Sequence, residues 1–129
     1  MVVDTSALLA VLLQEPEAAS FLARLSGAPR PLLSAASWLE LGIVIDARKG
    51  PQWLADLDGF LESLDVTVVP VTLRQARIAR DAYRRFGPGN HTAGLNFGDC
   101  FAYALAKERD LPLLFKGDDF ALTDIRPAL

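Results

Sequence analysis

The first thirteen residues, Met1–Leu13 (MVVDTSALLAVLL), place a single aspartate between an apolar strand and an apolar helix. Val2–Val3 begins the strand, and the apolar run that follows predicts a helix over Ala7–Leu13. Asp4 lies at the junction, where it is either the cap of the helix or part of a functional site. The rest of the chain has to distinguish these two roles.

Short apolar strands alternate with helices along the remainder of the chain. Three further strands are predicted at Leu32–Leu33, Val66–Val71 and Leu113–Phe115. Five further helices are predicted over about Glu15–Leu25, Ser34–Lys49 (capped by Ser34 or Ser37), Gln52–Leu64, Leu73–Phe86 and Asp99–Arg109. This alternation indicates one α/β domain over residues 1–129 with a mostly parallel sheet, in which functional groups gather at the carboxyl ends of the strands.

The composition argues against several classes of protein. Sixteen acidic and thirteen basic residues give a formal charge of −3, which is not the charge of a protein that holds nucleic acid by net positive charge alone. Apolar runs such as Ala7–Leu13 are too short to span a membrane, and the cationic start of a signal peptide is missing. The single cysteine, Cys100, fits a reducing cytoplasm. A hydrophobic content of 51% predicts apolar surface that meets a partner, such as a second copy of the chain.

Acidic residues at four places in the chain are not explained by the solvated surface of a helix. Asp4 follows the first strand, and Glu40 is the only charge within AASWLELGIVI. Asp99 opens the apolar helix DCFAYALA, and Asp118 and Asp119 follow the last strand in LLFKGDDF. Two strand ends and two helices can therefore deliver carboxylates to one edge of one sheet.

Two of these acids have a structural interpretation as helix caps. Asp4 and Asp99 each stand at a helix start, where a cap contributes about 1 kcal/mol. Neutral side chains can take over this task, however: Thr5 or Ser6 at the first helix and Asn96 at the last. Capping alone therefore does not require an aspartate at either position.

The remaining acids also have structural alternatives. Asp118–Asp119 after Gly117 can form a simple turn. Glu40 can pair with a buried arginine, because an unpaired carboxylate in an apolar helix costs several kcal/mol. Taken together, clustered carboxylates instead predict a site for a hard divalent cation, Mg²⁺ or Mn²⁺. Such a site suits metal-assisted hydrolysis of phosphodiester bonds.

Three stretches carry a resemblance to a known family: MVVDTSALLAVLLQEPEA, SAASWLELGIVI and LNFGDCFAYALAKERDLPLLFKGDDFALTDI. With their spacing they cover essentially the whole chain, and they resemble PIN-domain ribonucleases, most closely the VapC-type toxins of bacterial toxin–antitoxin pairs. The resemblance implies a PIN-like three-layer α/β/α sandwich with a mostly parallel central sheet. It also implies a Mg²⁺- or Mn²⁺-dependent endoribonuclease that leaves 5′-phosphate and 3′-hydroxyl ends.

The resemblance assigns roles to individual acids. Its first, second and third acids correspond to Asp4, Glu40 and Asp99, which are expected to hold the metal ion and carry catalysis. Many PIN domains place a fourth acid where this chain has a lysine. Here Asp118 is the expected fourth catalytic and metal-binding acid, and Asp119 is expected to position it.

Other residues are expected to support these acids. Ser6 resembles the hydroxyl residue that supports the first acid, and capping the helix is its structural alternative. Basic residues that can contact RNA phosphates are Arg48, Lys49, Arg84, Arg85, His91 and Lys116, of which Arg84, Arg85 and Lys116 are the assigned RNA contacts. For each of them, solvated charge at a helix end is the structural alternative.

Further side chains are expected to play structural parts. His91 is not expected to act as a general base, because a metal-activated water makes one unnecessary. Cys100 is expected to pack in the core, since nothing near it in sequence lowers the pKa of its thiol. Trp38 and Trp53 are expected to be core or dimer contacts rather than platforms for RNA bases.

The resemblance also implies partners. VapC-type toxins cut RNA, form homodimers, and are held inactive by a small VapB-like antitoxin whose tail lies in the active-site groove and presents an arginine to the acids. Two interpretations from other classes remain open. One is a PIN-like binding module that has lost catalysis. The other is a phosphoacceptor signalling domain, which has a similar length and a lysine near its last strand but leaves Glu40 unexplained. A phosphatase or a DNA nuclease would use the same site chemistry.

Overall fold

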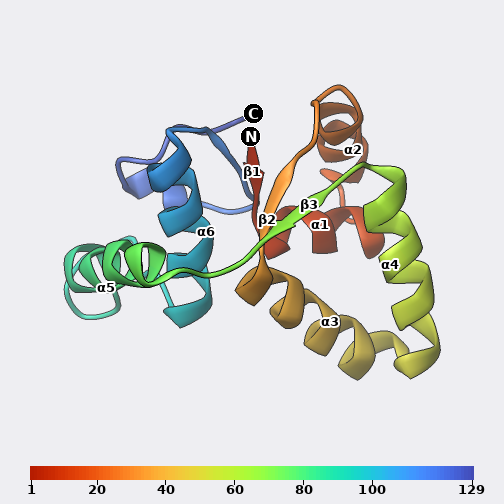
Figure 1. Cartoon of the computed structure of the whole chain (residues 1–129), viewed down its shortest axis with the longest axis horizontal. Helices are drawn as coiled ribbons and strands as arrows, with labels where there is room; N and C mark the ends of the chain where they lie inside the picture. Colours follow the sequence, from red (N-terminus) through yellow and green to blue (C-terminus); the bar gives the residue numbers. More distant parts are fainter.

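The computed structural model describes residues 1–129 and contains one parallel sheet with helices on both faces (Figure 1). The strands are β1 (Val2–Val3), β2 (Leu32–Ser34), β3 (Thr67–Val69) and β4 (Leu113–Leu114), in the order β3-β2-β1-β4. Because every neighbouring pair is parallel, all four carboxyl ends lie at the same edge of the sheet. The predicted parallel α/β architecture is confirmed.

Six α-helices connect and cover these strands. They are α1 (Thr5–Leu12), α2 (Ala18–Ser26), α3 (Ala35–Lys49), α4 (Leu54–Ser63), α5 (Leu73–Phe86) and α6 (Phe97–Arg109). Short 3₁₀ helices at Pro51–Trp53 and Phe120–Leu122 complete the chain. The structure differs from prediction at several element ends, two of which have a clear physical reason. Helix α6 begins before Asp99, because Asn96 is its N-cap, and β3 ends before Pro70, which has no N–H for a sheet hydrogen bond.

The sheet separates two hydrophobic cores. Successive side chains of a strand point to opposite faces, so Val2 packs into a core of 16 buried residues with α5 and α6. Val3 packs into a core of 12 buried residues with α1 to α4. The two helical layers lie on either side of the strands in Figure 1, with α5 and α6 on the left. The molecule is therefore the expected three-layer α/β/α sandwich.

Helix α3 is less buried than its sequence predicts. Only Ser37, Leu41 and Ile45 are buried, and their spacing of four residues marks a single stripe toward the core. The apolar side chains of Leu39 and Ile43 are 57% and 59% exposed. Trp38 and Trp53 both lie at the surface, which excludes the core position considered for them and leaves the alternative of a dimer contact as a prediction.

The C-terminal segment is held to the helices by an acid with three partners. Asp124 accepts hydrogen bonds from the Tyr103 hydroxyl at 2.7 Å and the Lys107 ammonium at 3.0 Å. Arg85 of α5 lies 3.6 Å away as a second cation. These contacts tie the C-terminal segment to α5 and α6.

None of the helices combines the length and the apolar character that crossing a bilayer requires.

Candidate active site

Asp4 lies directly after β1 and is almost fully buried, with 4% of its surface exposed. Its N–H donates to the carbonyl of Leu114 at 2.9 Å, which continues the pairing of β1 with β4. Its Oδ2 accepts the N–H of Ser6 at 3.0 Å and caps α1. Asp4 itself therefore caps the helix, a task for which the sequence also offered Thr5 and Ser6.

Burial gives Asp4 an unusual affinity for a proton. Removal from water raises the pKa of its carboxyl, and the nearby charge of Glu40 raises it further. Hydrogen bonds from Ser6 and Thr5 oppose this effect without cancelling it. A cap on an exposed helix would not need such a buried acid. Capping alone does not account for this burial, and the functional role expected of Asp4 stays a prediction.

Asp99 lies in the first turn of α6 and shares a capping box with Asn96. The Asn96 side chain accepts the N–H of Asp99 at 2.9 Å, and Asp99 accepts the N–H of Asn96 at 3.0 Å. Burial raises the pKa of Asp99 to about 6, against the backbone hydrogen bond from Asn96. The charges of Asp4, Asp119 and Glu40 add to the increase. Asp99 is thus the point at which the carboxylates act on one another.

Glu40 reaches the same place from α3. It is half-buried, and its carboxylate lies against Gly98 at the start of α6. It forms no ion pair with any lysine or arginine, so the buried Glu40–arginine pair considered as an alternative is absent. The apolar stretch around Glu40 suggests a buried side chain, but it is only half-buried because α3 turns a single stripe to the core.

The segment after β4 brings Asp118 and Asp119 to the same edge. The Lys116 N–H donates to the Ser6 hydroxyl at 3.0 Å, which fixes this segment to the start of α1. Gly117 then turns the chain with a φ of 98°, a conformation that favours glycine. Both aspartates are exposed, and it is the charge of Asp119 that raises the pKa of Asp99.

The acids gather at one edge without forming a preassembled metal site. No three of the His, Cys, Asp and Glu side chains lie close enough together, as they stand, to hold a metal ion. The available donors are carboxylate oxygens, which are the ligands that Mg²⁺ and Mn²⁺ prefer. Burial is the main cause of the raised pKa of Asp99, and repulsion from the other acids adds to it; a bound cation would offset both effects. The residues therefore fit a hard divalent cation in donor type and in charge.

The basic residues assigned as phosphate contacts differ in whether an acidic side chain already pairs with their charge. Lys116 pairs with Glu15 and, at 3.3 Å, with Glu17. Arg85 lies 3.6 Å from Asp81 and from Asp124. Arg84, its neighbour on α5, forms no ion pair. Of the assigned contacts, Arg84 is the one that carries an uncompensated charge.

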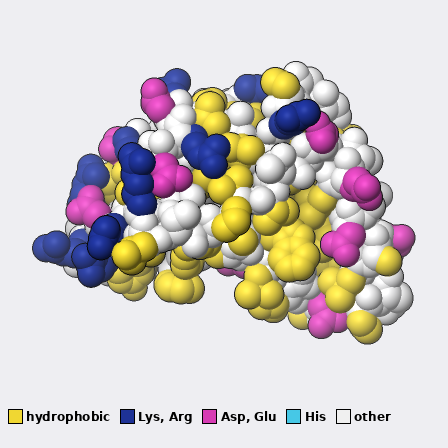
Figure 2. Space-filling model, in the orientation of Figure 1, with side chains coloured by type: hydrophobic (Ala, Val, Ile, Leu, Met, Phe, Trp, Pro, Cys, Tyr) yellow, Lys and Arg dark blue, Asp and Glu magenta, His cyan; other side chains and the backbone are white.

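Helix α5 is a basic element that the overall charge conceals. It carries five arginines (Arg74, Arg77, Arg80, Arg84 and Arg85) and one aspartate, a local balance of 5 − 1 = +4 in a chain of net −3. Figure 2 shows lysine and arginine side chains gathered over α5, and acidic ones over α4 on the opposite side. Counting charge along each predicted helix, rather than over the whole chain, would have found this surface.

His91 and Cys100 have structural surroundings. The His91 Nδ1 accepts the N–H of Ala93 at 3.0 Å, and the ring packs edge-on against Phe86 at 5.1 Å between centroids. Cys100 is buried, and burial raises the pKa of its thiol to about 11, so it is not a reactive thiolate. The prediction that Cys100 packs in the core is confirmed.

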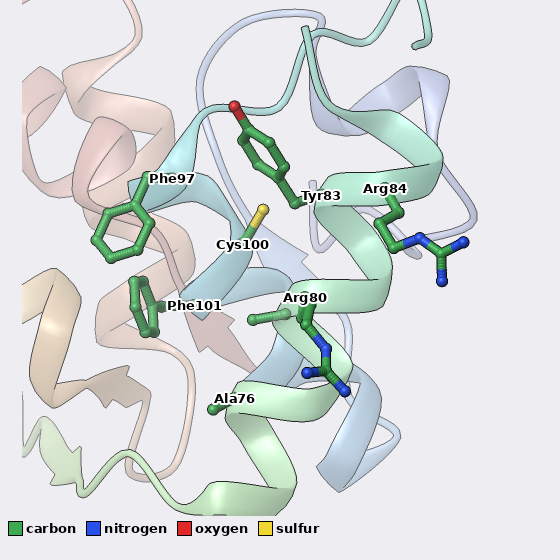
Figure 3. A pocket seen from close by; sticks show the side chains of 8 residues that line it. Ala76, Arg80, Tyr83, Arg84, Phe97, Cys100 and Phe101 are labelled. Atoms are coloured by element: carbon green, nitrogen blue, oxygen red, sulfur yellow. The ribbon is translucent and has the colours of Figure 1, made fainter.

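An apolar face, defined by Leu39, Ile43, Tyr83, Phe97 and Phe101, lies beside the acids and was not found from the sequence. Phe97 is 75% exposed, and it packs edge-on against Phe101 at 4.9 Å. Figure 3 shows these two rings on α6 and Tyr83 on α5 around a hollow of about 320 Å³. A second hollow continues from Phe97 to Leu39 and Ile43 on α3.

The fold and the acidic edge define a class of α/β domain, which comparison with known proteins identifies. The sequence matches the PIN domain family over residues 1–125. It is 52% identical over 130 residues to ribonuclease VapC28 of Mycobacterium tuberculosis, covering 100% of this chain and 98% of that protein. It is 50% identical over 125 residues to ribonuclease VapC of Mycolicibacterium smegmatis, covering 97% of each. The chain belongs to the PIN-domain family, among the VapC ribonucleases.

Solved structures agree on the fold. The structure resembles Mycobacterium tuberculosis VapC20, a toxin that cleaves the sarcin–ricin loop, with a TM-score of 0.73 and 19% identity over 98% of each chain. It also resembles a chain of a toxin–antitoxin complex from Klebsiella pneumoniae, with a TM-score of 0.69 and 17% identity over 93% of this chain and 89% of that one. The match to the PIN domain family and the identity to VapC ribonucleases, rather than the fold alone, rule out the phosphoacceptor interpretation.

Proposed function

We propose that this chain hydrolyses phosphodiester bonds of RNA with Mg²⁺ or Mn²⁺ and acts as the toxin of a toxin–antitoxin pair. The relatives at about half identity are named ribonucleases, which supports the reaction class. The observation that supports the proposal for the site is geometric: Asp4, Glu40, Asp99 and Asp119 come from four segments of the chain to one edge of the sheet. They lie close enough there for the other three charges to add to the effect of burial on the pKa of Asp99.

The cation would be held by Asp4, Glu40 and Asp99, with Asp118 or Asp119 as the fourth acid. When bound, such an ion lowers the pKa of a water to form a nucleophile and offsets charge on the leaving oxygen. The chain's own contribution is to hold the acids in place. The Ser6 N–H holds Asp4, and the capping box with Asn96 holds Asp99. The electrostatic effect of Asp119 on Asp99 supports Asp119 over Asp118 as the fourth acid.

The RNA backbone would approach over α5. Phosphate contacts contribute affinity that falls with salt, and unpaired arginines are the side chains best placed to make them. Arg84 and Arg80 line the hollow beside Phe97. Phe97 itself precedes Asp99 by two residues in the chain. Arg85 and Lys116, whose charges are already paired, would contribute less.

Two protein partners are proposed as well. The apolar face would bury Leu39, Ile43 and Phe97 in a homodimer, because exposed apolar side chains gathered in one area are typical of such an interface. A VapB-like antitoxin would cover the acidic edge, and the likeness to a toxin–antitoxin complex supports such a partner. We also propose a cytoplasmic location, for which a single buried free cysteine is the supporting observation.

The proposal is tested by cleavage of a mixed pool of cellular RNA with the purified, antitoxin-free chain. Wild type and Asp58→Asn, which removes an exposed acid of α4, should cut at discrete positions with Mg²⁺ or Mn²⁺ and leave 5′-phosphates. EDTA or Asp4→Asn should abolish the cuts. Cleavage that survives EDTA would refute the metal mechanism. A folded wild type that binds RNA without cutting any of it would favour the catalytically silent binding module.

A further inference from the structure

Gly98 stands between Phe97 and Asp99 in the first turn of α6, where its missing side chain leaves room for another residue. A Cβ built on Gly98 would overlap Oε2 of Glu40 and lie 3.2 Å from its Cδ. The space that any other residue would fill at position 98 is therefore occupied by the carboxylate that reaches over from α3. The hollow between α3 and α6 is lined by both residues.

The backbone does not require a glycine at this position. The positive φ values of the chain's glycines are found at Gly50, Gly89, Gly94 and Gly117, whereas Gly98 has a helical backbone that alanine adopts readily. Glycine is also a poorer helix former than alanine. Helix formation therefore disfavours Gly98, and the reason for its presence has to lie in the space around it.

Two other glycines inside helices provide the comparison. At Gly42 of α3 and Gly59 of α4, an added Cβ would meet no atom within 4 Å. Among these three helix glycines, Gly98 alone has its Cβ position occupied, and the occupant is one of the acids of the proposed site.

We propose that Gly98 is a positioning residue: its lack of a side chain lets the Glu40 carboxylate approach the start of α6, beside Asp99, so that both acids can serve one cation. The inference rests on the proposed metal-dependent function. Glu40 Oε2 is the far end of a flexible, half-buried side chain, whereas the Gly98 backbone is fixed in a helix. An added methyl group therefore displaces the carboxylate and leaves the helix in place.

The consequence is a separation of stability from function. Gly98→Ala should fold, with a Tm that is unchanged or raised by roughly 2–5 °C because alanine favours the helix. The same change should weaken Mn²⁺ binding by about tenfold, the size of effect seen when a residue that orients a metal ligand is lost. Gly59→Ala is the matched control and should change the Tm in the same direction while leaving Mn²⁺ affinity unaltered.

A double-mutant cycle tests whether the effect passes through Glu40. The dissociation constant for Mn²⁺ is measured from the EPR signal of the free ion for wild type, Gly98→Ala, Glu40→Ala and the double variant. With Glu40 truncated there is no carboxylate to displace, so Gly98→Ala should have no further effect in that background.

Each remaining outcome contradicts the inference in a recognisable way. Equal Mn²⁺ affinity in wild type and Gly98→Ala overturns the positioning role and leaves the proposed function standing. The same loss in both backgrounds shows that the methyl group acts on Asp99 or the helix rather than on Glu40. A Gly98→Ala variant that does not fold shows that the helix gives way instead of the carboxylate. A wild type that binds no Mn²⁺ refutes the metal-dependent function together with the inference.

Discussion

Replacing Asp99 with asparagine should stabilise the metal-free protein at neutral pH. The folded state raises the pKa of Asp99 to about 6 from an ordinary 3.8, so the fold binds this proton more tightly than the unfolded chain does. Ionisation of Asp99 therefore lowers the free energy of unfolding as the pH rises through this interval. Asparagine carries no charge and can still accept the N–H of Asn96 in the capping box.

The size of the effect follows from the two pKa values. A tenfold difference in proton affinity corresponds to about 1.4 kcal/mol, so an increase from 3.8 to about 6 corresponds to about 3 kcal/mol when the carboxyl is fully ionised. Asp99 is partly exposed, and solvent screening reduces this figure to about 1–2 kcal/mol. The gain in the free energy of unfolding of Asp99→Asn over wild type should be complete above pH 6. It should be absent below about pH 4, where Asp99 is protonated in both the folded and the unfolded wild type.

Urea unfolding in EDTA measures this difference directly. Wild type and Asp99→Asn are compared at about pH 4 and about pH 7.5, with Asp56→Asn, an exposed acid in the first turn of α4, as the control that should gain nothing. Adding Mg²⁺ should then stabilise wild type and not Asp99→Asn, because only wild type keeps the Asp99 carboxylate that would bind the ion, and binding to the folded state stabilises it. An Asp99→Asn variant that is less stable than wild type at neutral pH, or a difference that does not depend on pH, would refute the reasoning.

Three further experiments test other parts of the structure. The partners of Asp124 lower its pKa against the opposing effect of burial, so Asp124→Asn should cost about 0.5–1 kcal/mol in unfolding experiments at neutral pH, and the cost should disappear as the pH falls below the carboxyl's ordinary value of 3.8. Arg84→Gln should reduce the salt dependence of RNA binding by about one phosphate contact, whereas Arg85→Gln, which removes a paired charge, should mainly lower the Tm. Ile43→Glu should convert a dimer to a monomer in sedimentation experiments, and an unchanged mass would place the interface elsewhere.

The fold was predictable because its signals are local. Short apolar runs separated by capped helices specify strands and helices without any long-range information, and parallel strands then place all carboxyl ends at one edge. The same rule brings Asp4, Asp99 and the Asp118–Asp119 pair to that edge from the sequence alone. The sequence did not show that Asp119 would act on Asp99, because the turn at Gly117 sets the directions of both aspartates, and the choice of the fourth acid stays a proposal.

The exposure of individual side chains and the contacts between distant residues were harder to predict from the sequence. The apolar stretch around Glu40 suggests burial, but an isolated chain does not reveal which stripe of α3 meets the core. The hydrophobic content predicted a partner surface without locating it on Leu39, Ile43 and Phe97. The role inferred for Gly98 depends on a residue 58 positions away in the chain (98 − 40 = 58), which no local pattern shows.

The most direct test of the central claim is a calorimetric titration of Mn²⁺ into the metal-free wild type and Asp4→Asn. It requires no knowledge of the RNA target, and it tests Asp4, the first of the proposed metal-binding acids in the chain. We expect wild type to bind the ion and Asp4→Asn, although folded, to bind it at least about tenfold more weakly. Equal binding by the two proteins, or no binding by wild type, would contradict the assignment of Asp4 to a metal-dependent active site.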